Sequence, residues 1–227
     1  MSIPGPRILF IDGLPGSGKS TAAASVGDRL SHARVFLESA PDHPLLPVTP
    51  DPMGAAFADI HATHSWESFA AAAFGKLDAF LASAEGDVEY VFESHPIQST
   101  FRVLFQLDAP AVAILQTWSD LQDRLAGVQP RLVYFEEGDP LQAVRGIAQR
   151  RGPAWKSYLV DALGQSPWIR ARGLSAAEGV DRWIVEYAEL SDRLARSWRF
   201  PMLTLPSRPA SYEARTEALI SWAMGTE

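Results

Sequence analysis

A run of nine residues near the N-terminus carries the residue types that bind phosphate groups. Residues 13–21 read Gly-Leu-Pro-Gly-Ser-Gly-Lys-Ser-Thr and fit the pattern G-x-x-x-x-G-K-[ST] at every fixed position. Glycines let backbone N–H groups turn inward around phosphates, and a helix start adds partial positive charge. Lys19 supplies an ammonium to the β- and γ-phosphates, and the Ser20 hydroxyl is a ligand for Mg²⁺. We expect the nucleotide contacts to come from Gly13, Pro15, Gly16, Ser17, Gly18, Lys19, Ser20 and Thr21.

The elements around this loop are typical of an α/β fold. Short apolar runs predict strands at residues 7–12, 34–38, 88–93, 131–135 and 201–205. Three of these runs have a continuous apolar centre, which suits strands buried on both faces of a parallel sheet; they are 7–12, 34–38 and 131–135. Apolar residues at helical spacing and Pro at helix starts predict helices at residues 21–30, 65–83, 110–126, 176–198 and 209–224. Strand–helix alternation predicts helices on both faces and a ligand site beyond the carboxyl ends of the strands.

The composition excludes several classes of protein. A length of 227 residues with 47% hydrophobic residues fits a single globular domain, residues 1–227. The sequence has no cysteine, which excludes cysteine-ligated metals, a thiol nucleophile and disulfides. A net charge of −7 disfavours nucleic acid and an anionic membrane as partners. Neither a secretory signal nor a run of ~20 apolar residues is present, so we expect a cytoplasmic protein.

The loop and three later segments resemble one group of enzymes. ILFIDGLPGSGKST resembles the start of the thymidylate-kinase-like and deoxynucleoside-kinase-like enzymes, in which an acidic residue, here Asp12, precedes the first loop glycine. RVFLESAP, VFESHPIQSTF and PRLVYFEEGDPLQAVRGIAQRRG are similar to later parts of these kinases, so the match covers residues 7–38, 88–106 and 130–152. The resemblance implies a P-loop fold, which is a three-layer α/β/α sandwich. Its five-stranded parallel sheet would have the order 2-3-1-4-5, and a helical lid would cover the site.

The same resemblance gives two carboxylates a role. The strand that ends at Glu93 would lie beside the loop strand, which puts Glu93 within reach of Mg²⁺; the alternative is a cap on the next helix. Glu38 would lie one strand further out and accept the proton of an attacking hydroxyl; the alternative is a solvated loop residue. Asp12 is expected to brace the loop. The chain departs from the family where Ser94-His95 follows Glu93 in place of Asp-Arg-Tyr or Asp-Arg-His, and where Glu38 lacks an Arg-Glu-Pro setting.

A basic segment, residues 140–172, is in the position of a lid by the same resemblance. Its basic residues, against the single acid Asp161, are Arg145, Arg150, Arg151, Lys156, Arg170 and Arg172. Guanidinium groups stabilise the charge of a transferring phosphoryl group, so we expect Arg145 and Arg150 to be catalytic and Arg151 to contact the nucleotide. Arg208, just past the last strand, is expected to line the nucleotide base. The alternative for the basic segment is a solvated helical face.

Two further features concern the acceptor. Residues 40–65, rich in Pro, Asp and His, are expected to shape the acceptor pocket. The aromatic residues Trp66, Phe69 and Trp118 either stack on an acceptor ring or pack in the core, and their helical spacing favours the core.

These patterns predict a P-loop kinase that moves the γ-phosphoryl group of ATP or GTP, with Mg²⁺, to a hydroxyl of a small molecule. The candidate acceptors are nucleosides, nucleotides and nucleoside-like or other antibiotics, the last of which would confer resistance. The alternatives are a non-catalytic nucleotide sensor and a GTPase-type switch; the switch is disfavoured because no Asn/Thr-Lys-x-Asp motif is present. No nucleic acid polymer or membrane is expected as a partner. The oligomeric state stays open, with a homodimer as one alternative.

Overall fold

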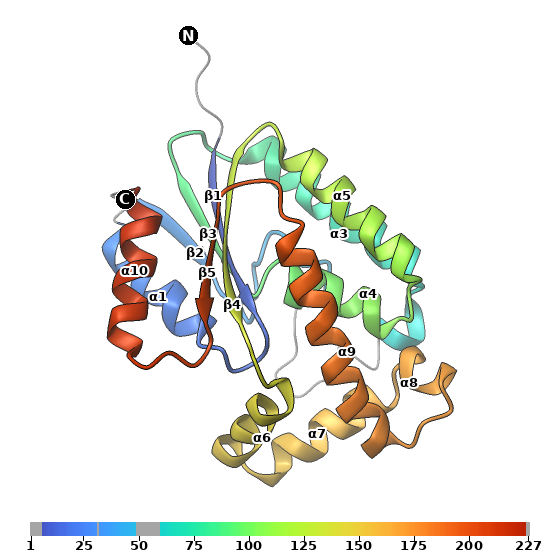
Figure 1. The fold of residues 1–227 in the computed structure, drawn as a ribbon. Helices are drawn as coiled ribbons and strands as arrows, with labels where there is room; N and C mark the ends of the chain where they lie inside the picture. The colour runs from blue at the N-terminus through green and yellow to red at the C-terminus, as the bar shows by residue number, and fades with distance from the viewer. Residues whose placement is uncertain (1–5, 31, 49–59, 226–227) are drawn as a thin grey trace.

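Five parallel strands form the centre of the molecule in a computed structural model that describes residues 6–30, 32–48 and 60–225 (Figure 1). They are β1 (Arg7–Gly13), β2 (Ala33–Phe36), β3 (Glu89–Glu93), β4 (Gln129–Glu136) and β5 (Met202–Pro206). The order β2-β3-β1-β4-β5 confirms the expected order 2-3-1-4-5. The strand bounds differ from the expected ones by one or two residues, and β2 ends at Phe36 rather than at Glu38.

The three central strands β1, β3 and β4 are buried on both faces. Two of the runs predicted to be buried in this way, 7–12 and 131–135, form β1 and β4, whereas the prediction is wrong for 34–38, because that run forms β2 at the edge of the sheet. In β1, Ile8 and Phe10 belong to the core on one face, while Leu9 and Ile11 belong to the core on the other. The edge strands β2 and β5 are only partly buried. The central strands thus form a rigid base. Their carboxyl ends hold Glu93 and residues 13–21, which we call the phosphate loop.

Helices cover both faces of the sheet (Figure 1). One face carries α3 (Trp66–Ser83), α5 (Ala111–Leu125) and α9 (Ala176–Arg196), and the other carries α1 (Lys19–Arg29) and α10 (Tyr212–Met224). No helix in the described part of the chain is long and apolar enough to cross a membrane.

Two details of the helical layers answer expectations from the sequence. Phe69 and Trp118 are buried in the core, which confirms the packing interpretation of these aromatic residues. The helix expected from residue 209 begins instead at Tyr212, because the Ser211 hydroxyl accepts a hydrogen bond from Ala214 N–H and caps the helix there.

The connection after β3 consists of two short helical segments. A π-helix, η1 (Ile97–Phe101), runs directly into α4 (Arg102–Gln106). Every residue of η1 is buried, and the Tyr187 hydroxyl of α9 donates to the Ile97 carbonyl at 3.2 Å. The segment is therefore fixed close to the carboxyl end of β1.

The expected lid region forms three helices at the carboxyl end of the sheet: α6 (Pro140–Arg151), α7 (Pro153–Gly164) and α8 (Pro167–Ala171) (Figure 1). They have an apolar core of their own. Leu163, Trp168 and Ile169 pack against Trp183 and other residues of α9 and reach Leu14 of the phosphate loop. The basic residues of this region thus lie on helices with a buried side.

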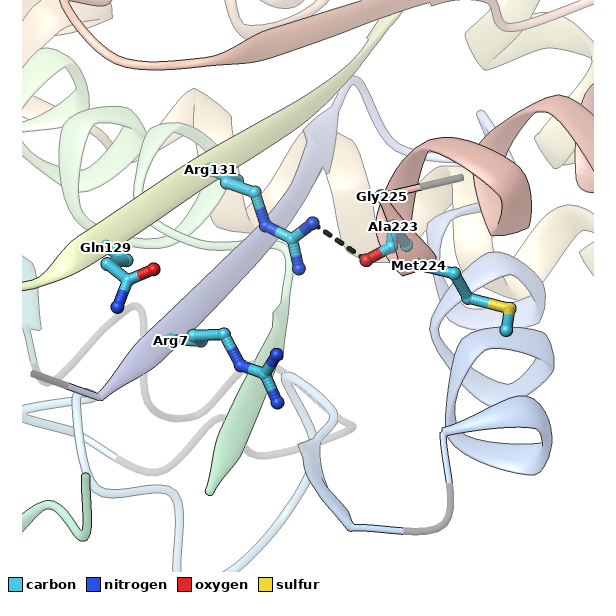
Figure 2. Close-up of a pocket in the computed structure, with 6 residues that line it drawn as sticks. All are labelled: Arg7, Gln129, Arg131, Ala223, Met224 and Gly225. Atoms are coloured by element: carbon cyan, nitrogen blue, oxygen red, sulfur yellow. Dashed lines mark hydrogen bonds between the residues drawn. The ribbon is translucent and has the colours of Figure 1, made fainter. Parts of the chain in front are cut away.

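A cavity of about 180 Å³ lies at the opposite end of the sheet, where the strands β1 and β4 begin and α10 ends (Figure 2). Arg131 donates to the Ala223 carbonyl at 2.7 Å and forms an ion pair with Glu89, which also pairs with Arg7 at 3.4 Å. Glu89 is buried, so the two guanidinium groups neutralise a carboxylate that would otherwise be costly to bury. These contacts attach the end of α10 to the sheet, and they have a structural role.

Candidate active site

The phosphate loop connects β1 to α1 with the features that an anion requires. Gly16 and Gly18 have φ values of 80° and 95°, which favour glycine. No side chain caps α1 at Gly18, and its first turn contains no acidic residue, so the N–H groups there are available to a phosphate. The Lys19 ammonium lies within the loop and donates to the Leu14 carbonyl at 2.8 Å.

The residues predicted to bind Mg²⁺ lie together. The Ser20 hydroxyl donates to Glu93 Oε1 at 3.1 Å, and the Ser94 hydroxyl donates to the same oxygen at 2.6 Å. The other oxygen, Oε2, accepts from the backbone N–H of Glu38 at 2.9 Å. A buried carboxylate of β3 therefore joins the phosphate loop to the residue predicted as the base.

The Glu38 carboxylate lies two residues beyond β2 and is held by the helical segment after β3. Gln98 Nε2 donates to Glu38 Oε2 at 3.1 Å, and Arg102 Nη2 lies 3.4 Å from Glu38 Oε1. The side chain of Glu38 is 24% exposed, so it is both oriented and accessible. Gln98 and Arg102 were not singled out by the sequence analysis, because nothing in the local pattern predicts a contact with a residue some 60 positions earlier.

Asp12 braces the loop, as expected, and also binds the segment after β3. Its carboxylate accepts from the N–H groups of Gly13 at 2.8 Å, Ile97 at 2.5 Å and Gln98 at 3.2 Å. Burial raises the pKa of Asp12 to about 7, although Lys19 and the three N–H donors favour the charged form.

Burial lowers the pKa of Lys19, and carboxylates oppose that effect. Asp12, Glu93 and Glu38 raise the pKa of Lys19, in that order, while Arg102 lowers it. All four groups are thus electrostatically linked to the loop lysine, and the site forms one cluster of charges.

Two histidines lie beside this cluster in uncharged form. Burial lowers the pKa of His43 to about 4 and lowers that of His95 well below its ordinary value. His95 contacts Phe10 and Phe92 and shares a hydrogen bond of 2.6 Å with Ser99. His95 is therefore a buried residue that packs against aromatic side chains.

Helix α6 lies over the phosphate loop. A Cβ on Gly16 would come within 2.6 Å of the Ile147 side chain and 3.6 Å of Arg150 Nη2, so both residues adjoin the loop. Arg145 lies five residues before Arg150, about 140° around the helix, and is exposed. Arg151 is exposed at the end of α6, with its guanidinium 6.0 Å from the Trp155 ring centroid.

Other basic residues of the lid region and beyond have structural partners. Arg172 pairs with Asp108 at 2.7 Å and lies over the Trp168 ring. Arg208, predicted to line the base, pairs with Glu137 at 3.3 Å at the turn between β4 and α6. Contact of Arg208 with a base stays a prediction.

Arg215 of α10 is a site residue that the sequence analysis missed. Its Nη1 donates to the carbonyls of Ser17 at 3.0 Å and Ser207 at 2.9 Å. Its guanidinium lies over the Phe135 ring, and a Cβ on Gly18 would come within 2.7 Å of Nη2. A buried cation thus supports the loop from the side of α10, and only long-range packing reveals it.

The residues present fit a nucleotide with Mg²⁺. The Ser20 hydroxyl and the Glu93 carboxylate are oxygen ligands of the kind that Mg²⁺ takes. In the described ranges, no group of three His, Asp or Glu side chains could hold a metal by itself. Phosphate oxygens and water would therefore complete the coordination, as is common for Mg²⁺ at nucleotide sites.

The segment predicted to shape the acceptor pocket is described in part. His43, Leu45 and Leu46 are buried beyond the end of β2. Residues 49–59 lie outside the described residues. The role of residues 40–65 in acceptor binding stays a prediction.

Comparison with solved structures finds this fold among nucleotide-binding proteins. The YorR protein of Bacillus subtilis, in complex with phosphorylated GDP, aligns with a TM-score of 0.53 and 14% identity over 96% of this chain and 95% of that chain. Thymidylate kinase of Candida albicans aligns with a TM-score of 0.51 and 15% identity over 100% of this chain and 94% of that chain. At these identities the likeness establishes the fold alone, which is the α/β sandwich with the strand order expected from the sequence.

No family model matches the chain. No curated protein matches its sequence either. Activity must therefore be argued from the site.

We expect Arg215→Ala to weaken nucleotide binding about 10-fold, because the loop loses charge-assisted hydrogen bonds at Ser17 and a nearby positive charge. Titration calorimetry with an ATP analogue measures the change. Arg29→Ala is the matched control, since Arg29 also links α1 to α10, through an exposed pair with Glu217 at 3.8 Å. Equal dissociation constants for wild type and Arg215→Ala would show that the guanidinium does not support binding.

Proposed function

We propose that the protein is a kinase that transfers the γ-phosphoryl group of ATP or GTP, with Mg²⁺, to a hydroxyl of a small molecule. The observation that carries the proposal is the bridging position of Glu93. One of its oxygens binds Ser20 of the phosphate loop, and the other binds the backbone of Glu38. Glu93 therefore connects the candidate Mg²⁺ ligand Ser20 to the candidate base Glu38, an arrangement suited to phosphoryl transfer to an acceptor.

The loop residues bind and orient the donor. N–H groups at the start of α1 and the Lys19 ammonium hold the phosphates, and Ser20 with Glu93 would hold the metal. Bound there, Mg²⁺ would neutralise charge on the β- and γ-phosphate oxygens. Arg150, which adjoins Gly16, would stabilise the transferring phosphoryl group, whereas Arg145 would have to reach the site from another face of α6.

Glu38 would accept the proton of the attacking hydroxyl. Its carboxylate is partly exposed, and the donors Gln98 and Arg102 keep it oriented. The proposed acceptors are nucleosides, nucleotides or hydroxyl-bearing antibiotics, since these offer a hydroxyl on a compact polar ring. A sensor that binds nucleotide without transfer would need no oriented carboxylate at this position.

The test of the function is a panel of these acceptors, assayed for ADP or GDP release and for a phosphorylated product by mass spectrometry. We expect at least one acceptor to be phosphorylated, and we expect Lys19→Ala to lose activity by several orders of magnitude while its unfolding transition is retained. Near-normal turnover by Lys19→Ala would contradict the kinase proposal. Nucleotide binding without any transfer across the panel would favour the sensor.

Glu38 and Glu93 should differ in their kinetic signatures. We expect Glu38→Gln to lower kcat by ~10²-fold or more with a small change in nucleotide affinity, because a general base is lost. Glu93→Gln should raise the Mg²⁺ concentration needed for half-maximal activity, because a charge next to the metal is lost. Steady-state kinetics over a Mg²⁺ titration separate the two, and identical Mg²⁺ profiles would contradict this division of roles.

Arg150 should contribute only as charge develops on the transferring group. We expect Arg150→Ala to lower kcat and kcat/KM together by about 10²–10⁴-fold, and Arg145→Ala to have a smaller effect. Arg150→Lys should not restore full activity, because an ammonium lacks the bidentate geometry of guanidinium. Arg182→Ala is the control, since Arg182 is an exposed residue of α9 paired with Glu186. If Arg150→Ala behaves like Arg182→Ala, Arg150 has no part in phosphoryl transfer.

A further inference from the structure

Asp12 connects two parts of the site that are distant in sequence. It is the residue before the first loop glycine and is fully buried at the end of β1. Its Oδ1 accepts from Gly13 at 2.8 Å and from Gln98 at 3.2 Å, and its Oδ2 accepts from Ile97 at 2.5 Å. A single carboxylate thus binds the phosphate loop and the first two residues of η1.

The N–H groups of Ile97 and Gln98 lie at the start of η1 and have no acceptor within that helical segment. The first residues of a helical segment have donors without intrahelical acceptors, and burial makes an unpaired donor costly. The backbone just before η1 is also constrained, because Ser94 has a φ of 61°, an uncommon value for a residue other than glycine. Asp12 therefore determines where η1 begins relative to the loop.

The segment that Asp12 anchors is the one that orients Glu38. Gln98 belongs to η1 and Arg102 begins α4, and both bind the Glu38 carboxylate. A displacement of η1 would move both donors together. The Glu38 backbone is held to the phosphate loop through Glu93, whereas the orientation of its carboxylate depends on a contact that neither Glu38 nor the nucleotide makes.

We propose that Asp12 is a positioning residue that fixes η1 and α4 to the phosphate loop and so sets the place of Glu38 relative to the transferred phosphoryl group. This role rests on the proposed kinase function. It requires that Asp12 act through Glu38, and not merely on the stability of the fold.

Asp12→Asn keeps the size of the side chain but replaces one of the two accepting oxygens with an NH₂ group. In either orientation of the amide, this NH₂ group faces an N–H donor of Gly13, Ile97 or Gln98, so a hydrogen bond is lost. We expect kcat to fall on the order of 10²-fold, with little change in the dissociation constant of the nucleotide, because the acceptor side is displaced. In a Glu38→Gln background the same substitution should lower kcat by less than about 3-fold, since residues that act as one unit are not additive. Additive losses would overturn the proposal.

Two further measurements keep this test decisive. Hydrogen exchange at the amides of Ile97 and Gln98 should be faster in Asp12→Asn, while exchange in α5 should be unchanged; unchanged exchange at both amides would overturn the proposal whether or not an acceptor is known. A wild type that transfers nothing would instead count against the proposed function.

If Asp12→Asn does not fold, Asp12→Glu is combined with Glu38→Gln in the same way. The longer side chain of Glu would displace η1, and an additive loss of kcat again overturns the proposal.

The matched control is Asp192→Asn. Asp192 of α9 accepts from the Tyr134 hydroxyl at 2.7 Å, and Tyr134 lies opposite Asp12 in the register of β1 and β4. Asparagine can still accept from that hydroxyl, so kcat and amide exchange should remain those of the wild type. An equal loss of kcat in Asp192→Asn would show that the loss does not depend on the contacts of Asp12 with η1, and would overturn the specific role of Asp12.

Discussion

The burial of charged groups at the carboxyl ends of β1 and β3 is the constraint on which the site depends. Asp12, Lys19 and Glu93 are each at most 5% exposed. A buried charge is stable only when hydrogen bonds and opposite charges replace its water. The two carboxylates therefore take partners from other segments: Asp12 from η1, and Glu93 from α1 and the residues after β2. The need to satisfy these charges brings the phosphate loop, η1 and the residues after β2 together.

The sequence was informative where the signal is local. Short apolar runs predicted all five strands, and the loop motif predicted the strand, loop and helix that the structure contains at residues 7–29. The strand order came from a family resemblance, and it is the order that brings Glu93 next to Ser20. The residues that orient this site could not be predicted in the same way. Arg215 lies 198 positions from Ser17, and only the packing of α10 against α1 brings the two together.

The basic lid segment has two different sides. Its charge suggested either a set of phosphate-binding arginines or a solvated face, and its five arginines are exposed, while the apolar side chains of its helices share a core with α9 and Leu14. At the surface of that core, the exposed Arg172 pairs with Asp108 and lies over the Trp168 ring. Arg150 adjoins Gly16, because it lies close to the face of α6 that carries Ile147. The helical phase, rather than the charge count, distinguishes Arg150 from Arg145.

The phosphate loop is held from two sides by residues that approach its glycines. Ile147 of α6 occupies the space a side chain at Gly16 would need, and the Arg215 guanidinium occupies the corresponding space at Gly18. The glycines are thus required by close packing as well as by their positive φ values. Since Ile147 and Arg150 lie on the same helix, α6 cannot shift relative to Gly16 without moving the arginine as well. The apolar contact therefore determines how far the Arg150 guanidinium lies from a phosphate bound in the loop, and it links the packing of the lid region to the electrostatics of the proposed transfer.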